Sequence, residues 1–71
     1  MTGVDARNVT KLAETARLWR RFRSEGRSGV DGDWEYDQAE HWFRCLCWVT
    51  QFDRKEGEDI DAYIERAAKL A

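Results

Sequence analysis

The sequence predicts a small all-α protein, a three-helix bundle built as one domain over residues 1–71. Three separate segments repeat their apolar residues with the period of an α-helix. The chain has no proline, and its five glycines fall where helices would stop. Hydrophobic residues make up 42% and charged residues 37%, a composition typical of a folded chain rather than a disordered one.

The first helix is expected from about Asn8 to Ser24. Asn8 is the expected N-cap, because its side-chain oxygen can accept a hydrogen bond from a free backbone N–H of the first turn. The apolar stripe has helical spacing and consists of Val9, Leu12, Ala16 and Trp19. Gly26 suits the left-handed conformation that often follows the last turn of a helix.

A loop-like segment over residues 26–32 precedes the second helix, which is expected from Asp33 or Trp34 to Arg54, with Gly57 ending it. Two apolar seams run along this helix. The first seam consists of Ala39, Trp42, Leu46 and Val49, with Phe43 beside them. The second consists of Trp34, His41, Cys45, Trp48 and Phe52. A helix that is apolar nearly all round is normally buried, so the second helix is expected to be the central one.

The third helix is expected over residues 59–70, with Asp59 as its cap. Its single amphipathic face consists of Ile60, Tyr63, Ile64, Ala67 and Leu70. Acidic residues lie near its beginning and Lys69 near its end, as the helix dipole favours.

The net charge of −2 conceals two blocks of opposite sign. The basic block consists of Arg17, Arg20, Arg21, Arg23 and Arg27. The acidic block consists of Asp31, Asp33, Glu35, Asp37 and Glu40. An antiparallel hairpin would place the two blocks side by side, so we expect them to neutralise each other. The alternative is a nucleic-acid-binding module whose arginines contact phosphates, which requires them to be free of those acids. A third interpretation makes the acidic block a contact for a basic partner.

The sequence predicts no metal, no cofactor and no enzyme. Cys45 and Cys47 point about 200° apart on a helix, so one ion cannot easily bind both, and we expect reduced thiols that pack as small apolar residues. Asp37, His41 and Cys45 do share a face, so half of a zinc site completed by another subunit is the alternative. The chain has one histidine, and it lacks both a glycine-rich phosphate loop and a nucleophile with a base at helical spacing.

The chain is expected to lie in the cytoplasm without membrane contact. Charged residues interrupt the first twenty positions, so they do not resemble a signal peptide, and the longest apolar run is too short to cross a bilayer. No motif is specific enough to indicate a family.

The four tryptophans, Trp19, Trp34, Trp42 and Trp48, are many for so small a core. Exposed tryptophan is enriched in binding hot spots. The seam Trp34, His41, Cys45, Trp48 and Phe52 is the candidate partner-binding surface, since His41 would be awkward in a dry core. The sequence therefore favours a regulator, inhibitor or adaptor that binds another protein or itself as a homodimer. Helical proteins of this small size often belong to mobile elements or to regulatory operons.

Overall fold

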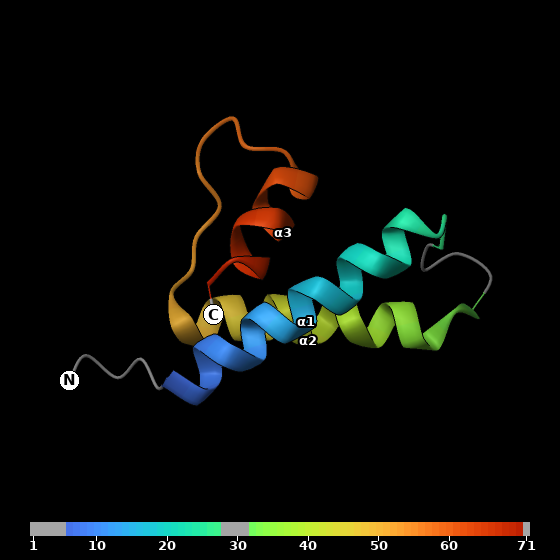
Figure 1. Cartoon of the computed structure of the whole chain (residues 1–71), viewed down its shortest axis with the longest axis horizontal. Coiled ribbons are helices and arrows are strands. Elements are labelled where there is room, and N and C mark those ends of the chain that lie inside the picture. Colours follow the sequence, from blue (N-terminus) through green and yellow to red (C-terminus); the bar gives the residue numbers. More distant parts are fainter. Residues whose placement is uncertain (1–5, 28–31, 71) are drawn as a thin grey trace.

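The all-α prediction is confirmed by a computed structural model, which describes residues 6–27 and 32–70. Its helices are α1 (Ala6–Ser24), α2 (Trp34–Thr50) and α3 (Ile60–Ala68). Figure 1 shows α1 and α2 running in opposite directions side by side, while the shorter α3 packs on α1. Within the described ranges, no helix has both the length and the apolar character that a membrane span requires.

The central helix is α1, so the expectation that the second helix would be central is wrong. It is α1 that packs against both α2 and α3. Leu12, Ala13 and Ala16 of α1 are completely buried, and the small alanine side chains allow neighbouring helices to approach closely. Neither α1 nor α3 covers the far side of α2, where several apolar residues remain exposed.

An aromatic cluster joins the three helices. The ring centroids of Trp19 in α1 and Phe43 in α2 lie 5.0 Å apart. The centroids of Phe43 and of Tyr63 in α3 lie 5.4 Å apart. Trp19 also meets Tyr36 edge-on at 6.3 Å. Such tilted and edge-to-face pairs add to the stabilisation that comes from burying the rings.

The start of α3 confirms the predicted cap Asp59, the start of α2 reveals Asp33 as a cap, and the start of α1 contradicts the predicted cap Asn8. Asp33 accepts a hydrogen bond from the Tyr36 backbone N–H at 3.2 Å, and Asp59 accepts one from Ala62 at 2.8 Å. The first helix already begins at Ala6, so Asn8 lies inside it and is not its cap. Helix propensity upstream of Asn8 therefore outweighs the preference of asparagine for a terminal position.

Gly26 adopts the predicted left-handed conformation after α1, with φ of 79°. The backbone N–H of Arg27 reaches back to the Phe22 carbonyl at 3.0 Å, which satisfies one carbonyl at the end of the helix. Of the loop that follows, residues 28–31 lie outside the described residues.

The second helix ends at Thr50, not at the predicted Arg54. Gln51 is left-handed with φ of 58°, and the N–H of Phe52 bonds the Cys47 carbonyl at 2.9 Å. This early end turns Phe52 inward, where its ring stacks on Tyr63 at 5.4 Å. Local periodicity cannot reveal this stop, because the contact that favours it comes from α3.

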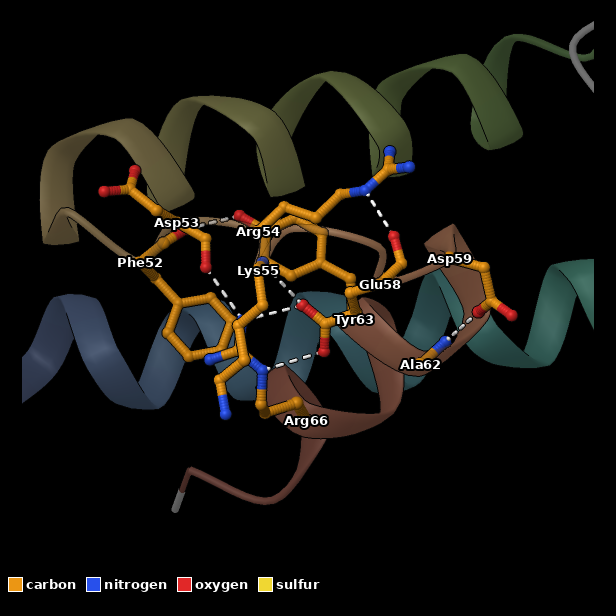
Figure 2. A network of polar contacts seen from close by, with 9 residues as sticks. All are labelled: Phe52, Asp53, Arg54, Lys55, Glu58, Asp59, Ala62, Tyr63 and Arg66. Atoms are coloured by element: carbon orange, nitrogen blue, oxygen red, sulfur yellow. Dashed lines mark hydrogen bonds and ion pairs between the residues drawn. The ribbon is translucent and has the colours of Figure 1, made fainter.

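The segment over residues 51–59 is tied to α3 by a polar network (Figure 2). Arg66 contacts the Glu58 carboxylate at 2.9 Å through two nitrogens and also donates to the Asp53 carbonyl at 2.8 Å. The hydrogen bonds from Arg66 lower the pKa of Glu58 to about 2. The Tyr63 hydroxyl donates to the Phe52 carbonyl. α3 itself ends at Ala68, slightly before the predicted position 70.

Candidate protein-binding face

The two sides of α2 differ sharply in exposure. Successive residues of a helix turn by about 100°, so the buried and exposed positions can be assigned to faces. The inner face, turned toward the other helices, consists of Tyr36, Ala39, Phe43, Leu46, Cys47 and Thr50. The opposite face, which we call the outer face, consists of Trp34, Gln38, His41, Trp42, Cys45, Trp48 and Val49. Tyr36 belonged to neither predicted seam, although its spacing from Phe43 is helical, whereas Cys47 is buried as expected of a thiol that packs as a small apolar residue.

The outer face contains most of the predicted partner-binding seam. Trp34 is 67% exposed and Trp48 is 84% exposed, which are large fractions for the largest apolar side chain. His41 is exposed as well, and Cys45 is partly so. Phe52 does not belong to this face, because α2 has already ended and the ring packs against the core. The structure thus brings four of the five predicted residues together.

Trp42 and Val49 lie on the outer face, although the sequence suggested that they belong to the core. They are 54% and 47% exposed. The expectation was wrong because it assumed that neighbouring helices would cover the whole first seam. In the structure, α1 covers only one side of α2. Their exposure increases the apolar area of the outer face.

A groove between α1 and α2 continues the outer face toward α1. It has a volume of about 770 Å³. Its apolar lining consists of Leu18 and Phe22 of α1 and of Trp34, Ala39 and Trp42 of α2, and polar and charged side chains form the rest of its walls. Leu18 is itself 38% exposed, which extends the apolar surface across the groove.

His41 and Cys45 contact each other on the outer face, with Cys45 Sγ and His41 Nε2 at 3.6 Å. Asp37 was the third residue considered for half of a zinc site. Across residues 6–27 and 32–70, no group of three or more His, Cys, Asp or Glu side chains is arranged to hold a metal ion.

The predicted pairing of the basic block with the acidic block holds for Arg27. This guanidinium binds Asp33 through two hydrogen bonds of 2.6 and 2.7 Å and reaches Glu35 at 3.3 Å. The hydrogen bonds from Arg27 lower the pKa of Asp33, and the same contact raises the pKa of Arg27. Arg27 also lies 3.9 Å from the centre of the Phe22 ring, so it fastens the end of α1 to the start of α2.

Arg20 and Arg23 pair with acids of α3 and, among the described residues, not with the acidic block, which corrects that part of the expectation. Arg20 pairs with Glu65 at 2.9 Å and Arg23 pairs with Asp61 at 2.8 Å, both in α3. Arg17 donates to the Ala68 carbonyl at 3.1 Å. The reason is the central position of α1, which turns one side of the helix toward α3 and away from α2.

Arg21 and Glu40, from the basic and the acidic block, contact neighbours within their own helices. Arg21 lies over the Phe22 ring at 5.7 Å. Glu40 pairs with Arg44 one turn later, at 2.9 Å. Asp31 lies outside the described residues.

The buried ionisable groups offer little nucleophilic chemistry. Burial raises the pKa of the Cys47 thiol, and it raises the pKa of the Tyr63 hydroxyl as well. Both groups are therefore protonated near neutral pH, and a thiol is a far weaker nucleophile than a thiolate.

Comparisons with protein-family models, with curated proteins and with solved structures found nothing that matches this chain.

Proposed function

We propose that this chain is a small non-enzymatic interaction module that binds another protein through the outer face of α2, acting as a regulator, inhibitor or adaptor. The observation that carries the proposal is the exposure of Trp34, Trp42 and Trp48 on one side of a single helix. Exposed apolar patches of this kind, rimmed by polar residues, typically mark sites of protein association. Tryptophan is also the residue type most enriched among binding hot spots.

The second candidate, a nucleic-acid-binding module, has less support. Arg20, Arg23 and Arg27 each contact a carboxylate within the chain. Those contacts would have to be exchanged for phosphate contacts, while the acids would remain nearby and repel the phosphates. Binding to duplex DNA that falls steeply with salt and is lost in Arg20→Ala would favour this candidate instead.

The substitution Trp48→Ala tests the proposed function. We expect association with a partner to weaken by about 2 kcal/mol or more, while the far-ultraviolet CD spectrum remains that of the folded helices. The measurement compares the host proteins retained by immobilised wild-type chain with those retained by the variant.

Leu70→Ala is the matched control, because Leu70 is an exposed apolar residue beyond α3 rather than on α2. It should retain the same proteins as the wild-type chain. Equal retention by the Trp48→Ala variant would contradict the proposal, and so would loss of helical signal in that variant.

A further inference from the structure

We propose that the outer face of α2 binds a second copy of this chain, forming a homodimer in which the two α2 helices lie antiparallel with a two-fold axis beside His41. This inference rests on the proposed function, since it names the occupant of the same surface. Three features support it: the spacing of the tryptophans, the placement of charges beside them and the apolar area they expose.

The spacing of the tryptophans suits an antiparallel pair. Trp34 and Trp48 lie seven positions before and after His41, which places them about 10 Å from it along the helix in opposite directions. Residues at this spacing stay on nearly the same side of a helix. In a symmetric pair centred on His41, each Trp34 would meet Trp48 of the second copy. The interface would then be self-complementary, as a two-fold dimer requires.

Trp42 also suits this arrangement, because it lies only about 1.5 Å from His41 along the helix axis, although it points about 100° away, to one flank of the outer face. A two-fold axis perpendicular to two antiparallel helices places the same flank of each helix on the same side of the pair, while the two chains run in opposite directions. Trp42 would therefore contact Trp42 of the second copy close to the axis. All three exposed tryptophans would be covered at once.

The charges beside the outer face favour the antiparallel direction. Asp37 and Arg44 are seven residues apart and so lie on the same flank of α2. Antiparallel pairing about His41 would bring Asp37 within about 1.5 Å, along the helix axis, of Arg44 of the second copy. Opposite charges would thus face each other twice. Parallel pairing would instead bring the acidic first halves of both helices to the same end, where they repel.

The exposed apolar area is sufficient for a specific dimer. At about 250 Å² for a fully exposed tryptophan, the exposed parts of Trp34, Trp42 and Trp48 amount to about 500 Å² per copy. Two copies would then remove about 1,000 Å² from water through these side chains alone, which is about the area at which a biological interface becomes credible. The small net charge of −2 on each chain opposes association only weakly.

Exchange of the two flanking charges tests the arrangement in the intact 71-residue chain. In Asp37→Arg an arginine faces Arg44 of the second copy, and in Arg44→Asp an aspartate faces Asp37 of the second copy. Each variant alone should dissociate about tenfold more readily than wild type. An equimolar mixture of the two variants should associate as tightly as wild type and consist mainly of heterodimers, because both cross-pairs are then of opposite sign. Sedimentation equilibrium and native mass spectrometry measure these outcomes.

Glu40→Gln is the matched control for Arg44→Asp. It removes the contact between Glu40 and Arg44 within one helix, at 2.9 Å, but leaves Arg44 free to meet Asp37 of the second copy. Its self-association should equal that of wild type. Trp48→Ala should weaken self-association about thirtyfold, with the helical CD signal retained.

The possible results separate this inference from the proposed function. A wild-type chain that remains monomeric up to millimolar concentration overturns the dimer, whereas retention of a different protein that depends on Trp48 would still support the proposed function. A dimer that is indifferent to both charge exchanges overturns the antiparallel arrangement. A chain that shows neither self-association nor any binding that depends on Trp48 overturns both.

Discussion

The inner and outer faces of α2 are similar in composition but opposite in environment. Each carries large aromatic and apolar side chains at helical spacing. Phe43 on the inner face is 1% exposed and contacts two other rings, whereas Trp48 on the outer face is 84% exposed. Apolar periodicity therefore identifies a helix without identifying which of its faces is covered. The uncovered face is the one available for a partner.

The largest expected effect contrasts one residue from each face. Phe43→Ala should lower the free energy of unfolding by about 3–5 kcal/mol, because it leaves a cavity at the centre of the aromatic cluster. A core of this size supplies only about 3–5 kcal/mol in total, so the variant should be largely unfolded. Trp48→Ala should change the same quantity by less than about 0.5 kcal/mol. Urea denaturation followed by CD measures both, and equal destabilisation would refute the distinction between the faces.

The next effect concerns the residue that caps the start of α2. Asp33→Ala should lower stability by about 1–2 kcal/mol, because Asp33 both caps the helix and binds Arg27. Asp33→Asn should cost less, since an amide oxygen can still accept the bond from the backbone of Tyr36. Asp59→Ala removes a cap alone and should cost about 1 kcal/mol. Thermal unfolding would rank the three, and a greater loss in Asp59→Ala would argue against the role given to Arg27.

The end of α2 offers a stabilising change. Gln51 has a left-handed backbone with φ of 58°, which glycine adopts without steric strain. Gln51→Gly should therefore raise the free energy of unfolding by about 0.5–1 kcal/mol. Gly57→Ala is the converse control: φ is 80° there, and an added Cβ would meet no atom within 4 Å, so its destabilisation would reflect backbone strain alone. A less stable Gln51→Gly protein would show that the side chain of Gln51 contributes more than its backbone costs.

The smallest expected effect concerns the contact between Glu58 and Arg66, which ties the segment containing Phe52 to α3. The pKa of Glu58 is about 2 in the folded chain, below its ordinary value of 4.5, so the unfolded chain takes up a proton first. The contribution of Glu58 to stability is therefore present above about pH 4.5 and is lost as the pH falls toward 2. Urea denaturation at several pH values should show wild type more stable than Glu58→Gln near neutrality, with the difference vanishing in acid. A difference that does not depend on pH would exclude the ionised contact with Arg66 as its source.

The sequence by itself determined the helical class, the cap Asp59, and the turn at Gly26. It also grouped Trp34, His41, Cys45 and Trp48 on one face. All of these follow from interactions within a few residues along the chain, such as a cap accepting a nearby N–H or side chains recurring every helical turn.

Only the tertiary structure decided that α1 is central, that α2 ends at Thr50, and that Trp42 and Val49 remain exposed. It also directed Arg20 and Arg23 toward α3 instead of toward the acidic block. Each of these outcomes depends on contacts between residues far apart in the sequence, such as Phe52 with Tyr63 or Arg23 with Asp61. Local spacing fixes the direction in which a side chain leaves its helix. Whether that side chain is buried depends on which helices pack beside it.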